Sequence, residues 1–222
     1  LALLPGPVPS HANKRENELL QKIAMLEVAV PKSVASLLAG RDGDKQIQAL
    51  LNQRLLIENK YQQIFTSDIP RKLVNATLQE KRSLLARLAN ESDWAYAKVS
   101  HFIASGQMPA LEQYLQNQAL GFSGQIAPGP AADLIIRHLP HFLPGSKILA
   151  YLLEILIQSE CLPLAEKVLA ENASPESIFI QVKTAYLAMK KKEYPKLGQL
   201  LARLARVPEE LRDEWLYLNF CY

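Results

Sequence analysis

Cysteine, glycine and net charge are all scarce in this chain, and each shortage excludes a class of protein. Two cysteines, Cys161 and Cys221, are too few for a disulfide framework or a thiolate zinc site, and whether they pair depends on the fold. Only 9 glycines and as many as 38 leucines, without an excess of β-branched residues, favour helix over sheet. A net charge of +3 is too small to indicate nucleic acid or an anionic membrane as a partner by itself. What remains is a chain of 222 residues, 49% apolar, with material for one large or two small domains.

The N-terminal residues 1–13 resemble the end of a secretory signal peptide. They contain no Lys, Arg, Asp or Glu, and Ser10-His11-Ala12 matches the small-x-small pattern of a cleavage site. A proline-rich linker explains the same residues, so both interpretations stand. We expect a periplasmic or secreted protein if residues 1–13 are a signal-peptide remnant, and a cytoplasmic protein otherwise.

Long apolar stretches are missing from the rest of the sequence. No run of about 18 or more apolar residues occurs, and the most apolar segment, 148–157, contains Glu154. We therefore expect a soluble mature chain with no transmembrane segment. At the C-terminus, Leu216, Leu218 and Phe220 continue a helical apolar pattern without a stop signal, so we expect the protein to continue beyond residue 222.

Five prolines share a pattern of apolar residues. An aliphatic residue or methionine lies at the start of each segment, and a large apolar residue lies directly before the proline. Proline is tolerated in the first turn of a helix, and it forces the preceding residue out of the helical region. Each segment therefore predicts the end of one helix, a tight corner and the start of the next helix. The five segments are 25–31, 64–70, 103–109, 157–163 and 189–195.

Helix pairs joined by such corners cannot bury their apolar stripes alone, so neighbouring pairs must stack. The predicted fold is all-α, an α-solenoid of stacked antiparallel helix pairs. The predicted domains are a signal-peptide remnant or linker at 1–13, helical hairpins at 14–121, a Gly/Pro-rich hinge loop at 122–131 and further hairpins at 132–222. Helices are expected near residues 14–30, 32–39, 45–66, 70–90, 93–105, 109–120, 132–142, 146–159, 162–172, 175–192, 195–206 and 208–222.

The C-terminal hairpins carry a longer pattern. Pro175-Glu176 and Pro208-Glu209 lie 33 residues apart, with Ala185-Tyr186 and Glu193-Tyr194 between them. This pattern resembles the tetratricopeptide repeat, which has a period of about 34 residues, a small residue in its first helix and a tyrosine at the corner. Leu197 departs from the pattern, because the family prefers alanine there. The resemblance covers about residues 92–222 and implies a solenoid that is tetratricopeptide-like (TPR-like) toward the C-terminus.

No group of side chains predicts catalysis or a metal site. His138 and His141 are three residues apart with Asp133 upstream, but no third zinc ligand stands at a known spacing. We expect both histidines to be partly exposed at a helix end, where positive charge is favourable. Cys161 follows Glu160, whose charge opposes thiolate formation. We therefore predict no catalytic, cofactor-binding or metal-binding residue, and no enzyme in this part of the protein.

Basic residues are concentrated between Lys183 and Arg206, a segment with seven of them and one acid, Glu193. Such a patch could bind an acidic peptide, a polysaccharide or a nucleic-acid backbone. Lysines at a helix end that complement the helix dipole also explain it. We favour the second interpretation, because aromatic residues suited to stacking on bases are missing apart from Tyr194.

The tetratricopeptide resemblance implies a concave face, formed by the first helix of each pair, that binds an extended peptide or a partner helix. It implies a non-enzymatic scaffold or adaptor for a protein partner, in a bacterial envelope or secretion assembly if residues 1–13 are a signal remnant. The alternative is the helical accessory or regulatory region of a larger enzyme whose catalytic domain follows residue 222. Val182 and Trp215 fit equally well as core residues. The inner-face positions are Tyr96, Ser100, Glu154, Gln158, Val182, Tyr186, Lys190, Trp215 and Asn219.

Overall fold

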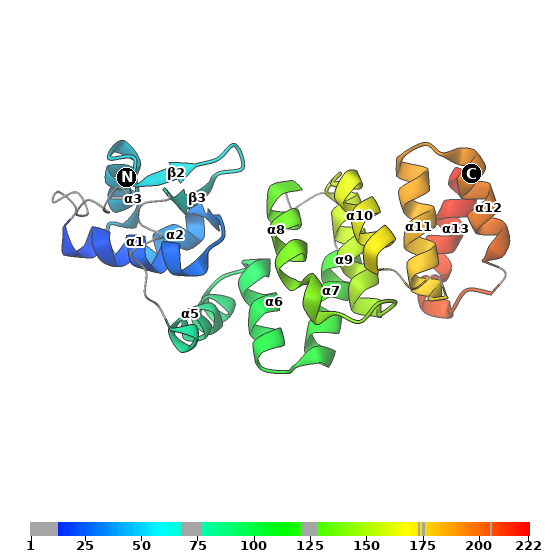
Figure 1. Ribbon diagram of the computed structural model, residues 1–222, viewed down its shortest axis with the longest axis horizontal. Helices are drawn as coiled ribbons and strands as arrows, with labels where there is room; N and C mark the ends of the chain where they lie inside the picture. Colours follow the sequence, from blue (N-terminus) through cyan, green and yellow to red (C-terminus); the bar gives the residue numbers. More distant parts are fainter. Residues whose placement is uncertain (1–12, 68–76, 121–127, 173, 175, 205) are drawn as a thin grey trace, which may run out of the picture. The chain divides into compact units, whose positions relative to one another are not determined.

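The computed structural model describes residues 13–67, 77–120, 128–172, 174, 176–204 and 206–222 (Figure 1). These residues are mostly helical, as the composition predicts. Every helix in these ranges is too short or too polar to span a bilayer. The chain divides into two compact units, residues 1–105 and 106–222, and each is described by itself.

The N-terminal unit contains a small sheet that the all-α prediction did not include. Its three strands pair antiparallel in the order β1-β3-β2, with Val30 opposite Ile64 and Ile57 opposite Phe65. The elements, in chain order, are α1 (Lys14–Leu26), β1 (Val30–Pro31), α2 (Lys32–Ala39), α3 (Gly43–Asn52), β2 (Leu56–Glu58), β3 (Gln63–Thr66), α5 (Leu78–Glu91) and α6 (Ala95–Ala104).

The first six of these elements follow the order of a winged helix-turn-helix. α2 packs against α3, and β2 and β3 form an antiparallel hairpin. The turn between the helices runs through Gly40 and Asp42, which both have positive φ, 73° and 62°. α5 packs against α6 and against α1.

Local signals set the ends of α1. The Asn13 side chain accepts a hydrogen bond from the Glu16 amide at 3.0 Å, and the Glu16 carboxylate accepts one from the Asn13 amide at 2.8 Å. This capping box satisfies two amides that the helix itself leaves without partners. The helix stops where Glu27 adopts the left-handed conformation, with φ of 58°. Between these ends, Leu19 and Ile23 are buried in the core of the unit.

The prediction of one helix over residues 45–66 is wrong. α3 ends at Asn52, and Arg54 takes a positive φ of 57°, which stops the helix. The Asn59 side chain then organises the hairpin turn, because its Oδ1 accepts hydrogen bonds from the amides of Tyr61 at 2.9 Å and Gln63 at 3.1 Å. The chain therefore reverses into two strands instead of continuing as a helix.

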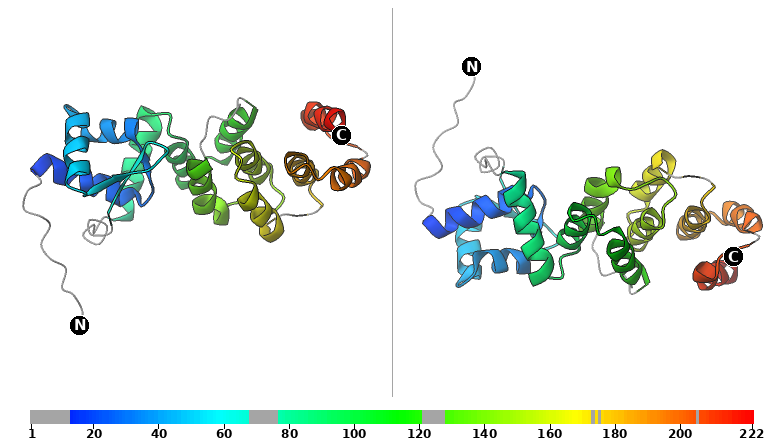
Figure 2. Two further views of the ribbon diagram at one scale, coloured as in Figure 1. Left: turned by 90° about the horizontal axis from the view of Figure 1, so that it is seen from above. Right: turned by 90° about the horizontal axis from the view of Figure 1, so that it is seen from below.

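In its described residues, the C-terminal unit consists of helices joined by short turns. α9 contacts α7, α8, α10 and α11, and α11 contacts α10, α12 and α13 as well. Figure 2 shows α11 and α12 (orange) beside α13 (red), all three seen almost end-on. The elements are α7 (Met108–Leu120), α8 (Pro128–His138), a 3₁₀ turn (Leu139–His141), α9 (Lys147–Gln158), α10 (Leu162–Asn172), α11 (Ile178–Lys190), α12 (Tyr194–Arg203), a 3₁₀ turn (Glu209–Leu211) and α13 (Arg212–Cys221).

Three of the five predicted proline corners are confirmed. Pro109, Pro163 and Pro195 are each the second residue of a helix, α7, α10 and α12. Pro31 instead lies in β1, directly before α2, so its corner joins a strand to a helix. Pro70 lies outside the described residues, as do residues 122–127 of the predicted hinge and residues 1–12 of the predicted signal remnant.

The three confirmed corners share a left-handed residue that the sequence did not reveal. In two of them, the amide after this residue donates a hydrogen bond to a carbonyl five residues back, from Cys161 to Leu156 and from Glu193 to Ala188, each at 2.9 Å. This bond closes the end of the helix as in a Schellman motif. The left-handed residues are Gly106 (φ 69°), Glu160 (φ 59°) and Lys192 (φ 62°).

Candidate partner-binding surface

Three helices of the C-terminal unit bring charged side chains together in its interior. α11 lies in contact with both α9 and α13, and its Lys183 is only 1% exposed. The Lys183 ammonium donates hydrogen bonds to Oε2 of Glu154 on α9 at 2.6 Å and to Oε2 of Glu214 on α13 at 2.5 Å. We call these three residues the ionic triad. It joins three separate helices at one point.

The ionic triad pairs one positive group with two acidic ones. Burial raises the pKa of the Glu214 carboxyl, and the charge of Glu154 adds to that effect while Lys183 opposes it. Oε1 of Glu214 is buried and has no hydrogen-bond partner among the residues that the structure describes. Burying the second carboxylate costs desolvation free energy, and this cost offsets part of the attraction between Lys183 and the two carboxylates.

Polar and aromatic side chains extend from the triad to the surface. Gln158, one turn after Glu154 on α9, donates a hydrogen bond to Oε1 of Glu154 at 2.9 Å. Tyr186 is half-buried one turn after Lys183, and burial, followed by the charge of Glu154, raises its pKa to about 12. Its phenol is therefore neutral and can donate a hydrogen bond at any physiological pH.

The exposed edge of this region is made by α11 and α13. Lys190 lies over the ring of Tyr186, with its Nζ 5.6 Å from the ring centroid, within the range of a cation–π contact. Tyr217 on α13 is 52% exposed and lies near Tyr186, whose pKa it helps to raise. We call Gln158, Tyr186, Lys190 and Tyr217 the partner surface.

The structure brings together four of the nine sequence-predicted inner-face residues: Glu154, Gln158, Tyr186 and Lys190. Tyr96 and Ser100 are buried on α6, which belongs to the N-terminal unit. Val182 is fully buried in the core between α11, α12 and α13, so the core interpretation holds for it.

The two predicted positions on α13 differ from each other. Trp215 is half-buried against the same core, and its indole Nε1 is buried without an acceptor in the described part of the chain. Asn219 is exposed, and its amide donates a hydrogen bond to the carbonyl of Trp215 at 2.8 Å. Neither side chain contributes to the triad.

Sequence reasoning missed Lys183, Glu214 and Tyr217. The sequence groups Lys183 with the basic segment, although it is the one charged residue in the mainly apolar stretch from Ile178 to Met189. A charge in the middle of an apolar helix predicts a buried partner, because an isolated buried ammonium is very costly. That signal was present in the sequence, but nothing in it identified the two carboxylates.

Part of the basic segment is paired with acids. Lys191 pairs with Glu166 and Glu193, and Lys196 pairs with Glu193 at 3.1 Å. Lys183 is buried in the triad. Among the described residues, Lys190, Lys192, Arg203 and Arg206 are in no ion pair.

The histidine pair differs from its predicted environment. His138 is only 7% exposed, whereas we expected both histidines to be partly exposed. Burial lowers the pKa of His138 to about 4, with smaller contributions from the charges of His141 and Arg137. The two rings lie 6.5 Å apart between centroids. Within the described residues, no three His, Cys, Asp or Glu side chains are grouped so as to hold a metal ion.

The two cysteines are both free thiols. Burial raises the pKa of Cys161, which disfavours its thiolate. Cys221 and Tyr217 both lie on α13, and a hydrogen bond between their side chains raises the pKa of Tyr217.

No protein-family model, curated protein or solved structure matches this chain. Inference about its function therefore rests on the geometry described above.

Proposed function

We propose that the chain is a non-enzymatic scaffold or adaptor, and that its C-terminal unit is a TPR-like α-solenoid which binds a protein or peptide on the partner surface. α9 with α10 and α11 with α12 are the stacked pairs, and α13 is the first helix of a further pair. The contacts of α9 with α11 and of α11 with α13 support this arrangement, since a solenoid places successive first helices side by side.

The observation that carries the proposal is the contact of α9, α11 and α13 at the ionic triad, because these are the first helices of the proposed pairs. The triad holds α9, α11 and α13 in one register, and the partner surface consists of the neighbouring residues on the same helices. Tyr186 and Tyr217 supply rings and Lys190 supplies an exposed cation, while the half-buried Gln158 is hydrogen-bonded to Glu154. Aromatic anchors surrounded by hydrogen-bonding groups are typical of surfaces that bind peptides.

Protein is a better candidate partner than nucleic acid, despite the winged helix-turn-helix order of the N-terminal unit. In that motif the second helix enters the major groove with its N-terminal residues. Here α3 begins beside Asp42 and Asp44, whose charges repel phosphates. Lys45 pairs with Asp42 at 3.7 Å, and Lys32 pairs with Glu58 at 3.6 Å, so these cations are already compensated.

Peptides selected against the 222-residue chain from a phage-displayed random library would test this proposal. Changing Tyr186→Ala together with Lys190→Ala should weaken peptide binding roughly tenfold or more, measured by fluorescence anisotropy, because it removes a ring and its cation. The matched control, Lys167→Ala with Glu171→Ala, removes two exposed side chains of α10 and should leave the affinity unchanged.

The half-buried Tyr186 contributes to the core as well, so a second variant separates folding from binding. Lys190 is exposed, and Lys190→Glu reverses its charge without opening a cavity. It should weaken the same peptides. Unchanged affinity in both variants, with intact far-UV circular dichroism, would reject the partner surface.

A further inference from the structure

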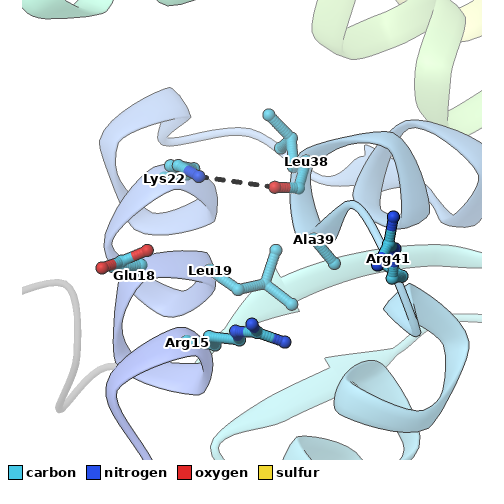
Figure 3. A pocket seen from close by; sticks show the side chains of 7 residues that line it. All are labelled: Arg15, Glu18, Leu19, Lys22, Leu38, Ala39 and Arg41. Atoms are coloured by element: carbon cyan, nitrogen blue, oxygen red, sulfur yellow. Dashed lines mark hydrogen bonds between the residues drawn. The ribbon is translucent and has the colours of Figure 1, made fainter.

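The N-terminal unit contains a cavity of about 330 Å³ between α1 and the turn that joins α2 to α3 (Figure 3). Arg15, Leu19 and Lys22 of α1 line one side of it. Leu38, near the end of α2, and Arg41, in the turn, line the other side. Apolar side chains thus form part of the wall, and three cationic side chains surround it. We call this cavity the cationic pocket.

The two arginine side chains of the cationic pocket have no acidic partner among the described residues. The Arg15 and Arg41 guanidinium groups form no ion pair or hydrogen bond there, although the backbone carbonyl of Arg41 accepts a hydrogen bond from Gln46 at 3.2 Å. Lys22 donates one hydrogen bond, to the carbonyl of Leu38 at 3.4 Å. Glu18 also lines the cavity, but Figure 3 shows its carboxylate on the outer side of α1, turned away from the arginines.

Some other cations of this unit have acidic partners. Lys81 pairs with Glu27 at 2.7 Å, and Lys98 pairs with Asp93 at 2.8 Å. The cationic pocket differs from these pairs because two guanidinium groups and an ammonium line one cavity, while the carboxylate of Glu18 is turned outward. Cations that line one cavity repel each other, and a bound anion would reduce that repulsion.

Arginine side chains favour one kind of anion. The planar guanidinium donates two parallel hydrogen bonds to phosphate or carboxylate oxygens, and two arginines on opposite walls can hold one tetrahedral phosphate from both sides. The apolar wall, made by Leu19, Leu38 and Ala39, suits the uncharged part of a small organic molecule. The volume is near the lower limit for small-molecule sites, about 300 Å³.

We propose that the cationic pocket binds a small phosphorylated molecule, with Arg15 and Arg41 holding the phosphate and Lys22 adding positive charge. A nucleic-acid backbone is disfavoured as the source of the phosphate, because Asp42 and Asp44 lie one and three residues after Arg41 in the chain and repel a polyanion. This site is independent of the partner surface.

Isothermal titration calorimetry on the 222-residue chain tests the proposal with inorganic phosphate, adenosine monophosphate and a short DNA duplex. Adenosine monophosphate should bind, and inorganic phosphate should compete with it. Arg15→Gln and Arg41→Gln should each weaken the binding of adenosine monophosphate roughly tenfold or more. The matched control, Arg82→Gln, removes an exposed arginine of α5 outside the cavity and should change nothing.

A charge-preserving variant separates hydrogen bonding from general electrostatics. Arg41→Lys keeps the charge but loses the paired donors, so it should weaken phosphate binding nearly as much as Arg41→Gln. The proposal fails if neither phosphate nor adenosine monophosphate binds at millimolar concentration. It also fails if the two glutamine variants bind like the control, or if the duplex binds more tightly than adenosine monophosphate and loses its affinity in the same variants.

Discussion

Replacing Lys183 with methionine should destabilise the C-terminal unit by about 3–4 kcal/mol at pH 7. The change removes the ammonium that both Glu154 and Glu214 contact and leaves two carboxylates facing each other in the interior. One of them must then take up a proton. With a reference pKa of about 4.3, keeping a glutamate neutral at pH 7 costs about 3.5 kcal/mol, which agrees with the 3–5 kcal/mol typical of breaking a buried ion pair.

The stability lost in Lys183→Met depends on pH. A carboxyl whose pKa is raised in the folded state binds its proton more tightly there than in the unfolded chain, so it favours folding at low pH and opposes it as pH rises. The loss caused by Lys183→Met should therefore shrink by about 1.4 kcal/mol for each pH unit below 7. Adding Glu154→Gln and Glu214→Gln should recover most of the stability at pH 7, because no charge then remains to neutralise.

Urea unfolding followed by tryptophan fluorescence measures this free energy. Trp215 adjoins Glu214, and a Trp94→Phe background removes the signal of the N-terminal unit. As a control, Lys196→Met removes an exposed cation paired with Glu193 and should change stability by less than about 1 kcal/mol. A loss below about 1 kcal/mol for Lys183→Met, or a triple variant no more stable than Lys183→Met alone, would refute the reasoning.

Two further changes test the histidine and the helix corners. Burial lowers the pKa of His138 from 6.5 to about 4. Between pH 6.5 and pH 4 only the unfolded chain binds this proton, so the free energy of unfolding decreases as the pH is lowered. In urea titrations, the free energy of unfolding of the wild type should decrease by about 2 kcal/mol more than that of His138→Leu between pH 7 and pH 5. The same pH dependence in both proteins would contradict this prediction. Lys192→Gly should be about 1 kcal/mol more stable than Lys192→Ala in thermal unfolding, because only glycine adopts the left-handed φ of 62° without strain. Equal midpoints would show that the corner carries no strain.

The helix starts of the C-terminal unit were predictable because proline acts locally. Pro109, Pro163 and Pro195 constrain their own φ and the preceding residue, whatever the rest of the chain does. The rule also placed the start of α2 directly after Pro31, but it missed the strand that Pro31 ends. The sheet depends on Val30 pairing with Ile64, far along the chain, and a local helical pattern carries no information about such a partner.

The triad was unpredictable for a related reason. The two glutamates that Lys183 contacts lie 29 and 31 residues away from it in the sequence. In the sequence, Lys183 stands near Lys190 and Lys191, so it is grouped with them as surface charge. Only the packing of α11 between α9 and α13 separates the buried lysine from the exposed ones.

The ionic triad links the shape of the proposed partner surface to the fold itself. Apolar contacts between helices tolerate small shifts, whereas the Lys183 ammonium reaches both carboxylates only when all three helices are in one register. Gln158 and Tyr186 lie one turn from Glu154 and Lys183, so the same register sets their spacing. A variant that keeps the helices but loses the triad, such as Lys183→Met with both glutamines, should then bind selected peptides more weakly although Tyr186 and Lys190 are unchanged.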